Sequence, residues 1–276
     1  VMEDAMEVVS GTAHAKDLEI VCDVDPTLHE FSQGDATRLR QILVNLLSNA
    51  IKFSFKGEIL VKAKSEDVAN DMVKYTFLVQ DEGIGIPPSA QSSLFEAFTQ
   101  ADTSITRKFG GSGLGLNICK QLVGLMGGEI WFVSKEGEGS TFYFTITGKK
   151  ENPPADYKPI ETIVPALNEA KSILVVENLP KTSQVLKKML ECWNLQPVLM
   201  VGPNEAIETL SNEAHQRHNL RFSAVLVDSR FGVDVIQKIQ QVHPRVIVMG
   251  YSKTKQLGEF PFLKKPIRMG RNASCI

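Results

Sequence analysis

A proline-rich segment near the middle of the chain constrains the fold more than any other feature of the sequence. Residues 148–170, GKKENPPADYKPIETIVPALNEA, contain Pro153, Pro154, Pro159 and Pro165 and show no helical or strand periodicity. Proline fixes the backbone and removes a hydrogen-bond donor, so this stretch favours an extended linker. Because the chain has 276 residues and a typical domain has about 150, we expect one domain on each side of the linker.

The two sides of the linker carry different patterns, and both predict α/β folds. The first side shows an opening amphipathic helix (Val1, Ala5, Val8, Val9, Ala13), a helix over 35–53, strands near 58–65 and 73–80, a helix over 113–126 and a hairpin over 129–146. The second side alternates strands and helices over 172–176, 181–192, 197–201, 203–214, 223–227, 231–241 and 245–250. This alternation predicts a parallel sheet with helices on both faces. A chain that opens inside a helix is expected to be a piece of a longer protein.

Composition and charge exclude several classes of protein. With 43% hydrophobic and 22% charged residues, the chain is not disordered, collagenous or a coiled coil. A net charge of −2 provides no broad basic surface for nucleic acid or an anionic membrane. A membrane span and a signal peptide are also not indicated, which predicts a cytoplasmic location for this part of the protein. The widely spaced cysteines predict free thiols: Cys22, Cys119, Cys192 and Cys275.

Three polar residues share one face of the helix over 35–53. Asn45 and Asn49 are four residues apart, and Lys52 follows one turn later. Amide oxygens and an ammonium in this arrangement could hold a metal ion and phosphates. Such residues more often form a solvated polar face, and the pattern alone leaves both interpretations open.

Two glycine-rich segments are candidates for contact with a nucleotide. Asp81 opens the sequence DEGIGIP at 81–87, directly after a strand, where an Asp can accept a hydrogen bond from an exocyclic amine and glycines permit close approach. The sequence GGSGLGL at 110–116 leads directly into a helix, whose N-terminus stabilises phosphate. A lone D-x-G-x-G is more often a turn, so the first segment by itself leaves that alternative open.

In this order, the motifs resemble the conserved boxes of sensor histidine kinases over residues 1–147. The matching segments are the helix 41–53 with its two Asn, DEGIGIP at 81–87, FEAF at 95–98, GGSGLGL at 110–116 and GEGSTF at 137–142. The resemblance implies the ATP-binding fold shared by gyrase, Hsp90, MutL and histidine kinases, a two-layer sandwich of helices on a mixed β-sheet. It also implies ATP and Mg²⁺ as cofactors.

The resemblance assigns roles to individual residues. It implies that Asp81 binds the adenine amino group, that Asn45 and Asn49 hold Mg²⁺ and the phosphates, and that Lys52 contacts phosphate. Residues 99–110 would form a lid over ATP, with Arg107 or Lys108 near the γ-phosphate and Phe95 and Phe98 at its hinge. The remaining residues expected to line the pocket are Gly83, Gly85, Gly111, Gly113, Leu114, Gly115, Leu116 and Thr141.

One position separates the reaction types within this superfamily. Hydrolysing members carry a Glu four residues before the metal-binding Asn, where this chain has Asn45, and an amide cannot act as a general base. Phosphoryl transfer is therefore expected instead of hydrolysis. None of the five histidines lies in a complete acceptor helix: His14, His29, His215, His218 and His243. The acceptor histidine is expected on a dimerisation domain outside this chain, with residues 1–17 as the end of the helix leaving it.

Residues 171–276 resemble a response-regulator receiver domain, of the doubly wound flavodoxin-like class. Glu177 follows the first strand, Asp228 ends the third as the candidate phosphoacceptor, and Lys265 precedes a proline. The second acid is replaced by Asn178, and Gly250 stands where the resemblance implies a hydroxyl residue. These departures favour a degenerate receiver-like domain, as in plant cytokinin receptors, which is phosphorylated poorly, and the short tail predicts that its fold is incomplete.

The leading interpretation is the ATP-binding catalytic part of a hybrid sensor histidine kinase. Its expected partners are ATP, the histidine-bearing dimerisation domain of the same parent protein and a downstream receiver or phosphotransfer protein, and the parent is expected to be a homodimer. A catalytically silent nucleotide-binding scaffold is the alternative from another class. A self-sufficient ATPase is disfavoured by the amide at position 45.

Overall fold

The computed structural model consists of two separately packed units, Val1–Ala155 and Asp156–Ile276. It describes all residues except 98–112, 155–171, 216–220, 252–256, 259 and 266–276. Most of the predicted linker and the whole predicted lid over 99–110 therefore lie outside the described residues. Strand β6 continues to Lys150, so the first residues of the proline-rich segment pair in a sheet.

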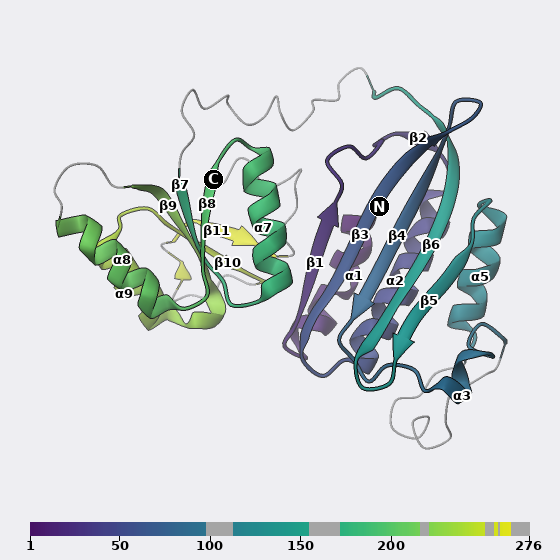
Figure 1. Ribbon diagram of the computed structural model, residues 1–276, viewed down its shortest axis with the longest axis horizontal. Coiled ribbons are helices and arrows are strands. Elements are labelled where there is room, and N and C mark those ends of the chain that lie inside the picture. Colours follow the sequence, from purple (N-terminus) through teal and green to yellow (C-terminus); the bar gives the residue numbers. More distant parts are fainter. Residues whose placement is uncertain (98–112, 155–171, 216–220, 252–256, 259, 266–276) are drawn as a thin grey trace. The chain divides into compact units, whose positions relative to one another are not determined.

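The first unit contains a mixed sheet (Figure 1). Its strands are β1 (Leu18–Val24), β2 (Ser32–Gln33), β3 (Gly57–Val68), β4 (Met72–Asp81), β5 (Ile130–Lys135) and β6 (Gly139–Lys150). They follow the order β1-β3-β4-β6-β2, and β5 pairs with β6. Only β1 and β3 pair in parallel among these strands; the described partners of β4, β5 and β6 are antiparallel.

Helices cover one face of this sheet, as Figure 1 shows. They are α1 (Met2–His14), α2 (Ala36–Phe53) and α5 (Gly115–Leu125), and the short α3 (Pro88–Gln91) follows the end of β4. The side chain of Asp35 caps α2 by accepting hydrogen bonds from Thr37 and Arg38 N–H groups. The helices bury their apolar faces with alternate residues of β4 and β6, such as Phe77 and Phe144, whose rings stack 4.8 Å apart.

Helix α1 differs in one respect from the face expected from the sequence. It buries Ala5, Val9 and Ala13 as predicted, but Val1, which precedes the helix, and Val8 are exposed, and Met6 is buried. At about 100° per residue, position 8 turns away from the core that positions 5, 9 and 13 define.

A lysine joins the end of α1 to the end of α2. Lys16 lies in the turn after α1, and its Nζ donates to the carbonyl oxygens of Ile51 and Lys52 at 2.7 and 3.1 Å. These are among the last carbonyls of α2, which have no partner within the helix. The contact fixes the C-terminal turn of α2 against the start of the unit.

The second unit is a five-stranded parallel sheet. Its strands β7 (Ser172–Val176), β8 (Gln196–Met200), β9 (Phe222–Asp228), β10 (Val246–Gly250) and β11 (Phe262–Lys264) follow the order β11-β10-β9-β7-β8. Helix α7 (Pro180–Cys192) packs on one face, while α8 (Pro203–His215) and α9 (Val233–Val242) pack on the other. A 3₁₀ turn, η1 (Ser229–Phe231), separates β9 from α9.

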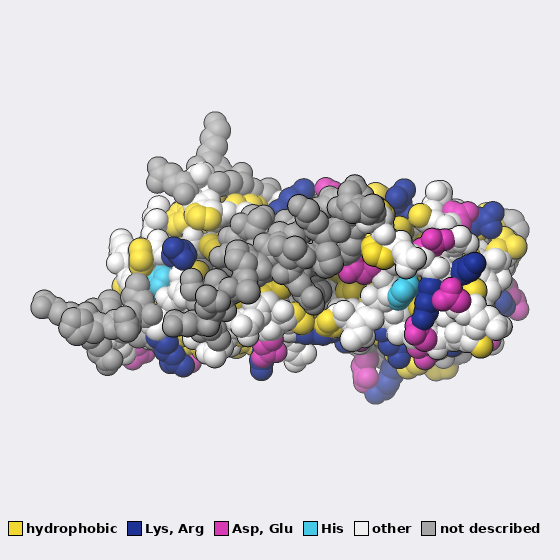
Figure 2. All heavy atoms as spheres, turned by 90° about the horizontal axis from the view of Figure 1, so that it is seen from above, with side chains coloured by type: hydrophobic (Ala, Val, Ile, Leu, Met, Phe, Trp, Pro, Cys, Tyr) yellow, Lys and Arg dark blue, Asp and Glu magenta, His cyan; other side chains and the backbone are white. Residues whose placement is uncertain are grey.

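The predicted fold class is confirmed for both units. The resemblance to sensor histidine kinases implied the mixed sheet with helices on one face, and the alternation of strands and helices predicted the doubly wound parallel sheet. Figure 2 shows acidic and basic side chains interspersed over the described part of one face, in keeping with the net charge of −2. No helix among the described residues has both the length and the apolar composition to cross a bilayer.

Candidate functional site

Asp81 lies at the end of β4, against the C-terminal end of α2. Its carboxylate is buried, with 7% of the residue exposed, and its Oδ1 accepts a hydrogen bond from the Gly83 N–H at 2.8 Å. The next N–H, of Ile84, donates to the Phe53 carbonyl at 3.2 Å. A Cβ at position 83 would lie 2.5 Å from that same carbonyl oxygen, so only glycine allows this approach. The loop therefore holds the Asp81 carboxylate in a fixed position beside α2.

Asn45 and Gly115 bring α2 and α5 together. The Asn45 Nδ2 donates to the Gly115 carbonyl at 2.7 Å. A Cβ at position 115 would lie 2.6 Å from the Asn45 Oδ1, so the absence of a side chain lets the amide rest on the first turn of α5. The amide of Asn45 is thus oriented at a helix N-terminus, where a negative charge is stabilised.

Three of the residues predicted to bind a nucleotide, Asn45, Asn49 and Lys52, lie along α2. Asn45 and Asn49 are half-buried, and the Lys52 Nζ lies 4.9 Å from the centroid of the Phe53 ring. The helix rises about 1.5 Å per residue, so the span from Asn45, next to α5, to Phe53, next to the Asp81 loop, is about 12 Å. The structure therefore brings the predicted amides, the Asp81 carboxylate and the start of α5 to one side of the unit.

Other predicted pocket residues flank this arrangement. Gly85 and Gly113 have positive φ angles of 68° and 69°. Leu114 precedes α5, Leu116 packs on the core, and Thr141 pairs with Gln80 beside Asp81. Four predicted site residues lie outside the described residues: Phe98, Arg107, Lys108 and Gly111.

Phe95 packs at the base of α5. Its ring centroid lies 5.8 Å from that of Phe132 on β5, and its carbonyl accepts a hydrogen bond from the Asn117 side chain at 2.9 Å. The segment that enters the predicted lid is therefore attached to α5.

One turn beyond Leu116 on α5, Cys119 is buried, and this burial raises the pKa of its thiol to about 12 despite a hydrogen bond with Asn45. This thiol is not a nucleophile at neutral pH.

The second unit collects the other three predicted residues at the carboxyl ends of its strands. Glu177 follows β7, Asp228 ends β9 and Lys265 follows β11, the edge at which doubly wound sheets place their sites. All three are buried, with 2%, 1% and 2% of the residue exposed, respectively. The Lys265 Nζ contacts the Asp228 Oδ2 and lies 3.2 Å from the Glu177 Oε2.

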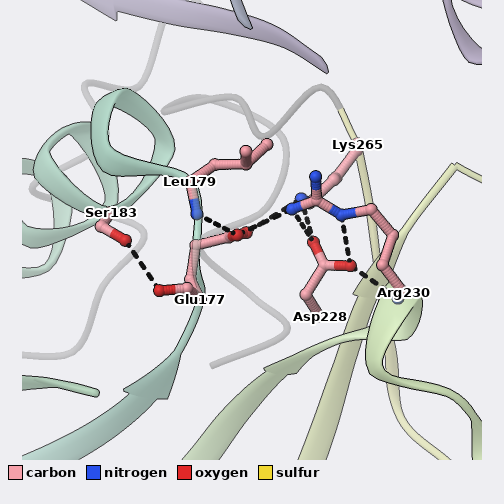
Figure 3. A network of polar contacts seen from close by, with 6 residues as sticks. All are labelled: Glu177, Leu179, Ser183, Asp228, Arg230 and Lys265. Carbon is pink, nitrogen blue, oxygen red and sulfur yellow. Dashed lines mark hydrogen bonds and ion pairs between the residues drawn. The ribbon is translucent and has the colours of Figure 1, made fainter. Parts of the chain in front are cut away.

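Arg230, which the sequence reasoning missed, is the fourth member of this cluster (Figure 3). Its guanidinium lies between the two carboxylates, 2.7 Å from the Glu177 Oε1 and 2.9 and 3.0 Å from the Asp228 oxygens. The available signal was an arginine two residues after an acid at a strand end.

The pKa values of the two carboxyl groups in the cluster are shifted in opposite directions. Burial is the largest influence on Glu177 and raises the pKa of its carboxyl, although Lys265 and Arg230 oppose it. Burial acts on Asp228 in the same way, but there the Lys265 ammonium and the Arg230 guanidinium prevail and hold the pKa of Asp228 well below its usual range. Of the two carboxyl groups, Glu177 therefore takes up a proton first.

Comparison with known proteins places the first unit in a family. Residues 34–150 match the family of histidine kinase-, DNA gyrase B- and HSP90-like ATPases. The sensor histidine kinase GacS of Pseudomonas protegens is 38% identical over 211 residues, which cover 76% of this chain and 22% of GacS. Hybrid signal transduction histidine kinase K of Dictyostelium discoideum is 29% identical over 300 residues, which cover 98% of this chain and 24% of the relative.

A solved structure shares the fold over nearly the whole chain. The crystal structure of full-length ShkA in complex with AMPPNP matches with a TM-score of 0.70 and 23% identity, and the match covers 99% of this chain and 54% of ShkA. At this identity the likeness concerns the fold alone. The chain spans less than a quarter of the length of the two curated relatives described above.

Proposed function

The first unit of this chain is a histidine kinase-type ATP-binding domain, a member of the histidine kinase-, DNA gyrase B- and HSP90-like ATPase family, and on this premise we propose that it donates the γ-phosphate of ATP to a histidine on a dimerisation domain. The observation that carries the proposal is the arrangement along α2, where Asn45 rests on α5 and the Asp81 loop rests on Phe53. A parent sensor kinase, homodimeric and acting in a phosphorelay, is part of the proposal.

We assign a role to each of the proposed pocket residues. Asp81 accepts a hydrogen bond from the adenine amino group, because the Gly83 N–H already fixes the orientation of its carboxylate. The N-terminal turn of α5 stabilises the phosphates, together with Gly111, Gly113 and the Lys52 ammonium. Asn45 and Asn49 offer amide oxygens, which are ligands that Mg²⁺ accepts when most of its shell comes from phosphates and water. When bound, Mg²⁺ would neutralise phosphate charge. Arg107 would act near the γ-phosphate from the segment that precedes α5.

The same pocket is poorly suited to hydrolysis. A general base would have to accept a proton from water, and the amide of Asn45, which donates to Gly115, has no basic group. Of the described histidines, His243 is poorly placed to accept a phosphoryl group, because it is buried and its Nε2 bonds the Phe222 carbonyl oxygen at 3.0 Å. Transfer to a histidine supplied by another domain remains the reaction that this site supports best.

A transfer assay tests the proposal directly. With γ-labelled ATP and Mg²⁺, the chain alone should incorporate negligible label. Addition of a separately purified dimerisation domain from a related sensor kinase should give acid-labile, base-stable label on that domain. ATP binding without any transfer to a panel of such domains would instead support a silent nucleotide-binding scaffold.

Gly115→Ala should weaken ATP binding about tenfold without unfolding the first unit. The new Cβ would lie 2.6 Å from the Asn45 Oδ1, and such overpacking costs about 1–3 kcal/mol. The Asn45 amide must therefore move away from α5. Gly124→Ala is the matched control, because it lies on the same helix and its Cβ would meet no atom within 4 Å. Calorimetric titration with ATP should separate the two variants, and equal affinities would contradict the role given to Asn45.

For the second unit we propose a receiver-like domain that has lost features of an active receiver. The parallel order β11-β10-β9-β7-β8 and the grouping of Glu177, Asp228 and Lys265 support this reading. A downstream receiver or phosphotransfer protein would then accept the phosphoryl group from the parent kinase.

A further inference from the structure

We infer that Arg230 is a built-in cation of the second unit, which occupies the space between Glu177 and Asp228 and closes the pocket to divalent metal ions. An acidic pocket at this edge of a receiver-like fold would otherwise be expected to hold Mg²⁺ beside a phosphoacceptor aspartate. The inference rests on the charged cluster itself, and it does not depend on the ATP chemistry proposed for the first unit.

The guanidinium makes the contacts that a metal ion would need. Its Nε and one terminal nitrogen bind the two Asp228 oxygens at 2.9 and 3.0 Å, and the same terminal nitrogen binds the Glu177 Oε1 at 2.7 Å. Bidentate pairing of this kind is strong and directional. A metal ion could reach these oxygens only by displacing the arginine (Figure 3).

The charges of the cluster are already balanced. Glu177 and Asp228 carry two negative charges, and Lys265 and Arg230 carry two positive charges, all within ion-pair distance. A dication that displaced Arg230 would leave the buried site with one uncompensated positive charge. It would also find few ligands, because Mg²⁺ requires several oxygens and Asn178 is exposed and uncharged. Among the residues that the structure describes, no three His, Cys, Asp or Glu side chains are grouped to hold a metal ion.

The backbone around Arg230 is built to keep the side chain in place. The Asp228 Oδ1 accepts a hydrogen bond from the Arg230 N–H at 2.7 Å and thereby starts the η1 turn. The preceding residue, Ser229, packs on β10, since a Cβ at Gly250 would lie 2.4 Å from its Oγ. The glycine at position 250, which the sequence alone presented as a missing hydroxyl, therefore makes room for the turn that carries Arg230.

This arrangement has a functional consequence for Asp228. A phosphoacceptor carboxylate must present an oxygen to the phosphorus atom beside a bound dication. In this pocket both Asp228 oxygens bind cations of the chain itself. We therefore expect the second unit to pass no phosphoryl group through Asp228.

Paramagnetic broadening by Mn²⁺ tests the inference on the full, nucleotide-free chain. In ¹⁵N-labelled protein, the amide signals of Glu177 and of residues 228–231 should stay sharp in the wild type. In the Arg230→Ala variant, the same signals should broaden at an Mn²⁺ concentration at least about tenfold below any that broadens them in the wild type. Arg230→Gln, which keeps most of the stem, serves if the alanine variant does not fold. Arg245→Ala removes the same charge at an exposed position of the same unit and should behave as the wild type.

The possible outcomes separate cleanly. Sharp wild-type signals together with metal binding by the Arg230 variants support a built-in cation. Equal broadening in wild type and variants, or folded variants that still bind no Mn²⁺, would overturn it. Addition of Mg²⁺ with BeF₃⁻, a phosphoryl analogue, gives a second readout: the wild-type signals around Asp228 should not shift, and a shift would contradict the inference.

Discussion

Asp81→Asn is expected to weaken ATP binding about 100-fold or more. The carboxylate has two oxygens, and one of them already accepts the Gly83 N–H. An asparagine has one acceptor oxygen where the carboxylate has two, so with that oxygen facing the Gly83 N–H its NH₂ would face the adenine amine. Loss of a charge-assisted hydrogen bond costs about 1.5–3 kcal/mol, the added donor–donor contact increases this, and each 1.4 kcal/mol is about tenfold in affinity.

Calorimetric titration with ATP measures this effect, with circular dichroism as a check that the first unit remains folded. Asp71→Asn is the matched control, since Asp71 is exposed in the turn between β3 and β4 and has a positive φ of 59°, which asparagine adopts readily. An unchanged affinity in Asp81→Asn would remove the proposed adenine contact and, with it, the assignment of the pocket.

Lys265→Met is expected to destabilise the second unit by about 3–5 kcal/mol. The ammonium is buried between Glu177 and Asp228, and removal of one partner from a buried ion pair leaves an uncompensated charge, at about that cost. Arg230 alone cannot balance two carboxylates. Lys264→Met, at the neighbouring exposed position, should change stability by no more than about 0.5 kcal/mol.

The reporter for this measurement is already in the chain. Of its two tryptophans, Trp193 is buried in the second unit, so a Trp131→Phe background makes fluorescence during urea unfolding specific to that unit.

The pH dependence of the stability deficit in Lys265→Met has a defined sign. A lowered pKa of Asp228 contributes stability above about pH 4 that is lost on acidification. Without Lys265 the pKa of Glu177, which burial already raises, rises further, so the folded variant takes up a proton on Glu177 at a higher pH and its deficit should shrink as the pH falls from about 7.5 to about 5. A deficit that does not change with pH would point to lost packing instead of lost charge pairing.

Most of the helices and strands could be predicted because their hydrophobic patterns repeat over a few neighbouring residues. The alternation of Val73, Tyr75, Phe77 and Val79 identified β4, and the spacing of apolar residues identified α2. Strand β1 was not predicted, because Leu18–Val24 is buried at six successive positions and shows no alternation of apolar and polar residues. Its partner β3 is separated from it by the whole of α2, and such a pairing is visible only in the assembled sheet.

The residues of the charged cluster differ in the same way: three could be predicted from the sequence, and the fourth could not. Glu177, Asp228 and Lys265 were predicted through the resemblance to a receiver domain, each at the end of an apolar strand or beside a proline, and the doubly wound order brings them together. Arg230 enters the cluster through the η1 turn, whose start depends on a hydrogen bond from its own N–H to Asp228. That geometry reverses the interpretation of the pocket, from an incomplete metal site to a self-neutralised one, and no residue count would have revealed it.

The hydrogen bonds from Lys16 to the end of α2 have a mechanical consequence. The ammonium is attached to the turn after α1, and it holds the carbonyls of Ile51 and Lys52 at 2.7 and 3.1 Å. If α1 rotates or shifts along its axis, the ammonium must follow or leave those carbonyls without this partner. A displacement of α1 would thus act first on the end of α2 that holds Lys52 and supports the Asp81 loop. Lys16 therefore couples the position of α1 to the proposed nucleotide pocket.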